Sequence, residues 1–484
     1  MNIEIRNGRV IDPKNGVDRN TSLFIADGEV AGLGEAPAGF VADETIDATG
    51  CVVCPGLIDL GARLNSIEAE LAAAVAGGVT SVVVPPDADP PLDEPELADR
   101  LVHRAKEIAR ARVLPLGALT LGLKGERLAE LAGLKKAGCV AFSQANVPMV
   151  DTEALLRAME YAATFGFPVW LQPQDHWLAR NGIAHEGEVA SRLGLAGIPV
   201  AAETIAIGTI LQLVRDTGCR VHLTRISSAA GLAMLQRAKH DGLPVTCDIG
   251  VHHLLLTDND IGYFNPHARF SPPLRTERDR QALSTAVASG LAAICSDHTP
   301  VGADEKLLPF GEAKAGATGL EVLLPLTLKW AEAAGVAKHV ERFGGEAEPT
   351  GGSHDGIFAP VRSPGTQHGE SLVGERRWGS GWWNGRGIRR HLAFKIVRRF
   401  RGNLCLSHQH GNVSPITSKH DLLFAFDFPP MGGGISRWME ELARGYPRGE
   451  LIVSTGVLPG WQAADASLPN AVDRVAVPSH RLKT

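Results

Sequence analysis

The chain reads CVVCPGLIDL over residues 51–60, SIEAELAAAVAGG over 66–78 and VTSVVVPP over 79–86. The first and last of these runs are short and almost wholly apolar, whereas the middle run has apolar residues at helical spacing. Near-continuous apolar strands are typical of a parallel sheet that is buried on both faces. The segment therefore predicts a strand, a helix and a second strand, the repeating unit of an α/β fold.

The same alternation continues to about residue 338. The later apolar runs are RVLPLGAL, GCVAFS, FPVWLQP, RVHLTRIS, PVTCDIG and AAICSDH, with helical stretches between them. About eight such units predict a (β/α)8 TIM barrel over residues 51–338, with any active site at the C-terminal ends of the strands.

Three other regions flank or follow this pattern. Residues 1–50 contain short strand-like runs separated by Asn-Gly and Asp-Gly turns, which predict a partial β-sandwich. Residues 339–420 are rich in Gly, Arg and Trp and follow neither period. We interpret them as an irregular segment, either disordered or translated out of frame, rather than as a basic nucleic-acid arm. Residues 421–484 regain order and predict a short terminal βαβ fragment.

The composition favours an ordinary globular protein. Hydrophobic residues make up 44% of the 484 residues, charged residues 21%, and the net charge is −6. This balance predicts no nucleic-acid partner and no membrane association. The 7 cysteines are scattered, which favours reduced residues in the cytoplasm. Cys51 and Cys54 form a CxxC pair, which we interpret as core packing rather than as a redox or metal site.

Ten phrases that occur in order over the first two-thirds of the chain resemble bacterial dihydroorotases, which belong to the amidohydrolase superfamily. They are PGLIDL, AAAVAGGVTSVVVPPDADP, GALTLGLKGERLAEL, VAFS, EGEVASRLGLAGIPVAAE, VHLTRISSAAG, VHHLLLTDNDI, SPPLRTERDR, SDHTP and GLEVLLPL. The resemblance implies an enzyme of pyrimidine biosynthesis that closes N-carbamoyl-L-aspartate to dihydroorotate. In that family zinc polarises the carbonyl and activates a water, and an aspartate after the last strand moves the proton.

The chemical residues of the family are mostly replaced in this chain. Asp297, in SDHTP, alone keeps the family's residue, and we interpret it as a vestige of the catalytic aspartate. The degenerate metal positions are Gly61 and Arg63 for the paired histidines, Gln144 for an aspartate, Gln172 for the histidine after strand five, and Arg225 for the histidine after strand six. The degenerate substrate positions are Asn65 for an arginine, Asp87 and Ser271 for asparagines, and Val301 for a histidine.

These replacements predict that zinc, the family's cofactor, is not bound here. Such a site needs about three protein ligands, and two guanidinium groups would oppose a divalent cation. The pattern resembles inactive dihydroorotase-like homologues that pair with aspartate transcarbamoylase. We therefore expect a non-catalytic structural partner of the aspartate transcarbamoylase catalytic chain, and leave a homo-oligomer open. The alternative is an active dihydroorotase or a related cyclic-amide hydrolase with an atypical site.

Other polar residues have competing interpretations. His252 and His253 could replace the lost ligands, although a hydrogen-bonded structural role is favoured, and we interpret His222 as structural. Asp175, His176 and His185 could form a new site on one loop, or they could be three separate side chains in contact with solvent. We favour the second interpretation. For Asp297 we favour an ion pair with Arg63 or Arg225, which would satisfy a charge left buried.

The C-terminal region carries a second resemblance. Residues 421–484 resemble the start of a group 1 glycosyltransferase of the GT-B type, with the strand-like DLLFAFDFPP, the loop MGGG, and a strand at ELIVSTG. The donor-binding half of such an enzyme has no counterpart, so a gene fusion or a frameshift near residue 340 explains the segment best. Because residues 341–405 do not resemble the returning strands of dihydroorotases, we expect the N-terminal strands to have an unpaired edge.

Overall fold

The computed structural model describes residues 1–336, 394–400, 403–405, 421–424, 451–456 and 471–475. The chain divides into two units. The first comprises Met1–Glu4, Val10–Thr45 and Val53–Lys395, and the second Ile5–Arg9, Ile46–Val52 and Ile396–Thr484.

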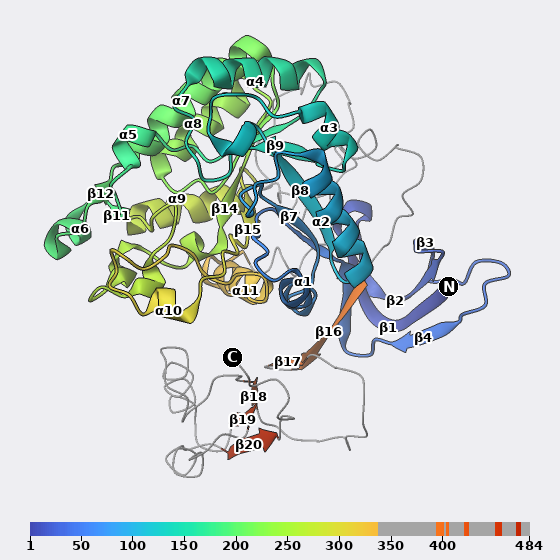
Figure 1. Ribbon diagram of the computed structural model, residues 1–484. Helices are drawn as coiled ribbons and strands as arrows, with labels where there is room; N and C mark the ends of the chain where they lie inside the picture. The colour runs from blue at the N-terminus through green and yellow to red at the C-terminus, as the bar shows by residue number, and fades with distance from the viewer. Residues whose placement is uncertain (337–393, 401–402, 406–420, 425–450, 457–470, 476–484) are drawn as a thin grey trace. The chain divides into compact units, whose positions relative to one another are not determined.

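The first unit contains an eight-stranded parallel sheet that is rolled into a barrel (Figure 1). Within residues 1–336, its strands in chain order are β6 (Leu57–Asp59), β7 (Val79–Val84), β8 (Arg112–Ala118), β9 (Ala141–Ser143), β10 (Val169–Leu171), β13 (Val221–Leu223), β14 (Val245–Gly250) and β15 (Ala293–Cys295). Each strand pairs with the next along the chain. The predicted α/β barrel is confirmed.

Helices connect the strands and cover the outside of the sheet (Figure 1). They are α1 (Ile67–Ala76), α2 (Pro95–Ile108), α3 (Leu131–Lys136), α4 (Thr152–Thr164), α7 (Val200–Thr217), α8 (Ala229–His240), α9 (Glu277–Ala288) and α11 (Leu323–Ala333). Local sequence sets several of their ends. Asp151 caps the first turn of α4, and Gly218 ends α7 in a left-handed conformation that suits glycine.

The first and last strands meet through short contacts beyond their ends. Ala62 and His298 form a parallel bridge, in which the backbone N–H of Arg63 donates to the His298 carbonyl at 2.9 Å. The buried carboxylate of Asp59 accepts bonds from the backbone N–H and the hydroxyl of Ser296, at 2.7 and 2.5 Å. Burial raises the pKa of Asp59 to about 6, against the effect of these bonds. The Asp59 side chain thus helps to join the two edges of the sheet, where β6 and β15 would otherwise pair through their backbones.

Two apolar layers hold the barrel together. The larger one lies between strands and helices and includes Phe142, Leu71 and Ile207, which are fully buried. A smaller one gathers Val83 and Leu116 with the partly buried Trp170. Alternate residues of a strand face opposite sides of a sheet, so the two layers use the two faces of the same strands.

Long connections follow β10, β14 and β15. They contain α5 (His176–Ala179), β11 (Ala184–His185), α6 (Glu188–Leu193), β12 (Gly197–Ile198), the 3-10 helices η3 (Val251–Leu254), η4 (Asp258–Ile261) and η5 (Pro266–Ala268), and α10 (Ala303–Lys306). A separate apolar cluster that includes Phe270, Phe310 and Leu274 packs these connections against one another. The loops that follow the strands therefore have a core of their own.

The N-terminal strands form a sheet, as expected. They are β1 (Asn2–Asp12), β2 (Val17–Ala26), β3 (Glu29–Leu33), β4 (Glu44–Asp47) and β5 (Cys51–Pro55), with the 3-10 helix η1 (Pro13–Asn15) between the first two. Asp27 and Gly28, both with positive φ, make the tight turn of the β2–β3 hairpin. Cys51 is buried and Cys54 half-buried, which agrees with core packing.

Two strands correct the prediction for residues 339–420. β16 (Phe394–Phe400) and β17 (Asn403–Cys405) form an antiparallel hairpin, and the sheet order continues β17-β16-β5-β1. The expected unpaired edge is therefore occupied at β5. The sequence FKIVRRF alternates too briefly to stand out among its basic neighbours, which is why the pattern gave no strand. The rest of that segment lies outside the described residues.

Three further strands are described in the C-terminal region. β18 (Asp421–Phe424), β19 (Leu451–Gly456) and β20 (Ala471–Val475) pair in parallel in that order. Strands were expected at the first two of these places, and the resemblance to a glycosyltransferase stays a prediction. None of the helices in the described part of the chain is both long and apolar enough to cross a membrane.

Candidate active site

Arg63 extends from the segment after β6 across the C-terminal end of the barrel. Its Nε and Nη2 atoms both lie 2.9 Å from Oδ2 of Asp87, which follows β7. Nη2 also donates to Oδ1 of Asn146 at 2.8 Å, and Nη1 donates to the Thr299 hydroxyl at 3.0 Å. The guanidinium is thereby connected to the ends of three other strands.

Arg225 approaches the same place from the end of β13. Its Nη1 atom donates to Oδ1 of Asp297 at 3.2 Å and to the Ser271 carbonyl at 3.1 Å. Its Nη2 atom donates to Oε1 of Gln172 at 2.9 Å and to Oδ1 of Asn146. The expected ion pair of Asp297 is confirmed, with Arg225 as the partner.

The backbone and the surrounding charges fix Arg225 in this position. The residue has a φ of 55°, and its backbone N–H donates to Oδ1 of the buried Asp248 at 2.7 Å. Burial by itself would lower the pKa of Arg225, but nearby carboxylates, first that of Asp297, outweigh it and raise the pKa above its usual value. The guanidinium is therefore a permanent buried cation that requires its partners.

Asn146 was not singled out from the sequence, although it joins the two arginines. Its Oδ1 atom accepts a bond from each guanidinium. Ala145, with a φ of 51°, turns the chain immediately before it. The phrase AFSQAN places Asn146 two residues beyond Gln144, and a polar residue just past a barrel strand is the signal that could have found it.

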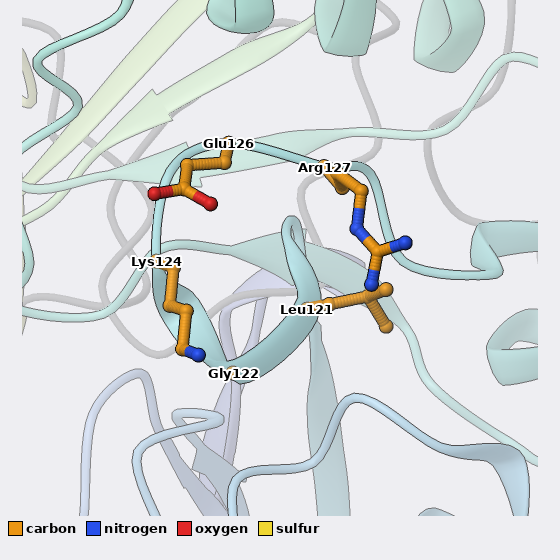
Figure 2. Close-up of a pocket in the computed structure, with 5 residues that line it drawn as sticks. All are labelled: Leu121, Gly122, Lys124, Glu126 and Arg127. Atoms are coloured by element: carbon orange, nitrogen blue, oxygen red, sulfur yellow. The ribbon is translucent and has the colours of Figure 1, made fainter.

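The hydrogen bonds of Gln144 go to the loop after β8 instead of to either arginine. Its Oε1 accepts from the Thr120 hydroxyl at 3.0 Å and its Nε2 donates to the Leu123 carbonyl at 2.8 Å. It therefore holds the loop after β8, which contains the 3-10 helix η2 (Leu121–Leu123). That loop surrounds a pocket of about 170 Å³, and the residues that line the pocket include Lys124, Glu126 and Arg127 (Figure 2).

The remaining predicted positions are Gly61, Ser271, Asn65 and Val301, and they differ in what they contribute. Gly61 lines the central cavity, and a Cβ added there would meet nothing within 4 Å. Ser271 offers its carbonyl to Arg225. Asn65 is exposed and donates to the Pro300 carbonyl at 3.1 Å. Val301 is half-buried, and its side chain has no polar atom.

The cavity at the barrel mouth is small. It measures about 30 Å³ and is lined by Gly61, Arg63, Arg225, Asp297 and Trp170, among others. Small-molecule sites usually measure roughly 300–1,000 Å³, whereas a volume of this size holds about one or two waters. Arg63 and Arg225 line this cavity, which is too small for a small-molecule ligand.

The histidines near the mouth are buried and neutral. Burial lowers the pKa of His253 and of His298 to about 4, and that of His252 is also lowered. His253 bonds the Pro272 carbonyl through Nε2 at 3.2 Å, and His298 accepts the backbone N–H of Gly319 through Nδ1 at 3.0 Å. The contact of His253 agrees with the hydrogen-bonded structural role favoured for that residue.

The loop site weighed for Asp175, His176 and His185 does not form. The Asp175 side chain caps α5 by accepting the backbone N–H of Leu178 at 2.9 Å. His185 is buried, and its Nδ1 lies 3.1 Å from Nη1 of Arg275. The side chains thus serve two separate local structures.

The donor set at the mouth does not fit zinc. Gly61 offers no side-chain donor, Arg63 and Arg225 are cations, and Asp297 is engaged in an ion pair. Among the residues that the structure describes, no group of three His, Cys, Asp or Glu side chains could hold a metal ion. No reaction step through a metal can be derived from these residues.

Solved structures with the same architecture define the class of fold. L-hydantoinase from Arthrobacter aurescens matches with a TM-score of 0.59 and 23% identity, over 67% of this chain and 76% of that one. D-hydantoinase from Thermus sp. matches with a TM-score of 0.56 and 20% identity, over 68% and 77%. These matches show that the chain shares the TIM-barrel fold of these structures.

Sequence relatives place the chain more narrowly. The family model described as Dihydro-orotase-like matches residues 50–230. A dihydroorotase-like protein from Pseudomonas putida is 47% identical over 337 residues, which cover 68% of this chain and 80% of the relative. A dihydroorotase from Geobacter sp. (strain M21) is 40% identical over 341 residues, with 69% and 80% covered. The chain belongs to the dihydroorotase-like family.

Proposed function

We propose that this protein is a non-catalytic member of the dihydroorotase-like family that acts in the cytoplasm as a structural partner of the aspartate transcarbamoylase catalytic chain. One observation carries the first half of the proposal. Arg63 and Arg225, at two positions where the family holds its metal, donate to the same atom, Oδ1 of Asn146. Two cations fill the mouth, and the carboxylates beside them are already paired.

Charge and space both oppose catalysis. A divalent metal would have to approach two guanidinium groups and compete with them for Asp87 and Asp297. A substrate with two carboxylates would need a pocket at least ten times larger than the cavity of about 30 Å³. Either requirement would demand that the whole hydrogen-bonded cluster separates.

The partnership rests on the resemblance to inactive homologues and on the intact scaffold. The loops after the strands keep an apolar core of their own, so the barrel stays rigid at the end where chemistry would occur. Two relatives from Pseudomonas carry the name dihydroorotase-like protein, which agrees with a divergent branch of the family. A rigid barrel without substrate access is suited to binding another protein.

The second candidate is an active cyclic-amide hydrolase. It is favoured by relatives about 40% identical that are named dihydroorotase and by the buried Asp297, which stands at the family's proton-transfer position. In this case the Arg225–Asp297 pair would have to open during turnover.

Metal content and turnover separate the two candidates. Purified full-length protein is analysed for zinc and assayed in both directions with N-carbamoyl-L-aspartate and dihydroorotate, with the Geobacter dihydroorotase as positive control. We expect substoichiometric zinc and no turnover above the rate of an Asp297→Ala variant. Stoichiometric zinc together with turnover that Asp297→Ala abolishes would establish the hydrolase.

The partnership has its own test. The aspartate transcarbamoylase catalytic chain of the same genome is produced alone and together with this protein, and the mass and carbamoyl transfer activity of each preparation are measured. We expect a larger complex and higher transferase activity when both chains are present. A catalytic chain whose mass and activity do not change would disprove this part of the proposal.

A further inference from the structure

Three side chains form a hydrogen-bonded chain along β13 and β14. His222 and Thr246 are register partners on these strands. Nδ1 of His222 lies 2.8 Å from Oγ1 of Thr246, and its Nε2 lies 2.8 Å from Oδ2 of Asp248. Cys247 packs in the core between strands and helices, so Thr246 and Asp248 on either side of it face the barrel interior. A hydroxyl, an imidazole and a carboxylate are therefore joined in that order.

The direction of the bonds follows from the carboxylate. Oδ1 of Asp248 already accepts the backbone N–H of Arg225 at 2.7 Å and the Cys295 thiol at 3.2 Å. Because a carboxylate oxygen accepts hydrogen bonds, Oδ2 accepts one from the Nε2–H group of His222. In the neutral imidazole the other nitrogen then carries a lone pair, so the Thr246 hydroxyl donates to Nδ1. This is the arrangement in which an imidazole can take the proton of a hydroxyl nucleophile.

Thr246 and Asp248, at the two ends of this series of hydrogen bonds, differ in their exposure to solvent. Asp248 is 1% exposed, whereas Thr246 is exposed. Thr246 is the second residue of β14 (Val245–Gly250) and lies at the N-terminal end of the barrel, opposite the end at which Arg63 and Arg225 lie. The Trp170 ring lies 4.3 Å from the His222 ring, centroid to centroid, and covers it. Thr246 is therefore reachable from solvent, whereas the imidazole of His222 and the Asp248 carboxylate are shielded.

We propose that Thr246 is an acyl-acceptor hydroxyl that reacts with small, activated acyl donors such as aryl esters. The bond between Oγ1 and the acyl carbon forms, and the bond between that carbon and the aryl oxygen breaks. The Oγ1 proton passes to Nδ1 of His222 and then to the departing aryl oxygen, so the products are an acylated threonine and a phenol. Asp248 stabilises the transient imidazolium and holds its orientation.

This inference is independent of the proposed function, because the reacting hydroxyl belongs to Thr246 at the N-terminal end of the barrel and the transfer involves no metal. Donors with good leaving groups are specified because an aryl oxygen departs readily, so that a hydroxyl and its adjacent base suffice for the transfer. The wall formed by Trp170 favours a small acyl group beside the imidazole.

The test uses p-nitrophenyl acetate and the full-length protein. Release of p-nitrophenolate is followed by absorbance, and the labelled position is found by peptide mass spectrometry. Thr285 is an internal control, because it is exposed on α9 and its hydroxyl donates to the Gln281 carbonyl at 3.0 Å instead of to a base. We expect Thr246 to be acetylated at least about 100-fold faster than Thr285, the range that a positioned general base provides.

Three variants sharpen the result. Thr246→Ser should keep the label at position 246, and Thr246→Val, which has nearly the same shape, should lose it. His222→Gln should slow acetylation of Thr246 by at least about 100-fold. If His222→Gln fails to fold in a thermal melt, the Thr246 variants and the Thr285 comparison still decide. Equal labelling of Thr246 and Thr285, or an unchanged rate in folded His222→Gln, would overturn the proposal.

Discussion

Two buried polar clusters of this barrel differ in what their hydrogen bonds connect. The carboxylate of Glu203, in the first turn of α7, accepts the backbone N–H groups of Ser227 and Ser228 at 2.9 and 3.0 Å, and both hydroxyls at 2.5 Å. The arginine cluster instead joins side chains to one another, through Arg63, Arg225 and Asn146. The Glu203 cluster fixes the backbone, whereas the arginine cluster fills the mouth of the barrel.

The difference shows which residues a barrel can exchange. Glu203 and the two serines lie in phrases that resemble active dihydroorotases, and their loss would leave backbone N–H groups buried without partners. The two arginines stand at positions where the family has metal-binding residues. There the fold requires only that each buried charge has a partner of opposite charge. The comparison predicts that a scaffold cluster tolerates change less well than a cluster of mutually paired side chains.

The largest effect is expected from Glu203→Ala. Four donors lose their acceptor, so the free energy of unfolding should fall by about 4 kcal/mol, since each unsatisfied buried group costs roughly 1–3 kcal/mol. Urea unfolding followed by circular dichroism measures it. Glu107→Ala, on the exposed face of α2, is the control and should change stability by less than about 0.5 kcal/mol. Similar losses for both variants would remove the scaffold role of Glu203.

Asp297→Ala should have the next largest effect, because Arg225 then stays buried without its carboxylate. We expect a loss of about 3 kcal/mol in the free energy of unfolding. The double variant Arg225→Met with Asp297→Leu should regain most of it, since well-packed apolar residues can replace a buried pair. A double variant no more stable than Asp297→Ala would show that the mouth depends on its charges in the same way as a scaffold cluster.

Asn146→Ala removes the acceptor that both arginines share. The expected loss is about 2 kcal/mol, typical of hydrogen bonds to charged groups. Val147→Ala, at the exposed neighbouring residue, should cost less than about 0.5 kcal/mol. If Asn146→Ala costs no more than this control, the arginines are held by their carboxylates alone.

The smallest effect concerns pH. Burial lowers the pKa of His253 to about 4 in the folded protein, so between pH 6.5 and 4 the unfolded chain binds a proton that the folded chain does not. This contribution to stability is complete above pH 6.5 and should fall by about 1 kcal/mol by pH 5.5. His253→Gln, unfolded in urea at both pH values, should show a smaller loss than the unaltered protein. Equal losses would mean that His253 titrates normally.

The barrel was predictable because its strands are short, almost wholly apolar runs at regular spacing, as in VTSVVVPP. The hairpin of β16 and β17 was not, because the stabilising pairing of FKIVRRF lies with β5, hundreds of residues earlier. At the mouth, the carboxylate of Asp297 is buried near Arg63 and Arg225. Because a buried charge needs a partner of opposite charge, an ion pair of Asp297 with one of these arginines could be predicted. Which side chain turns inward after β9 depends on the φ of Ala145, and sequence alone assigned Gln144 instead of Asn146.

The bridge between Ala62 and His298 has a consequence for how the barrel moves. Between β6 and β15, the described residues close the sheet with this bridge and the carboxylate of Asp59 instead of a strand ladder. Local opening needs the fewest broken bonds there, so amide hydrogens along this seam should exchange with solvent sooner than those of β7 and β8. The barrel is in effect an eight-stranded sheet whose two edges are held together by a few contacts, and it should open there first.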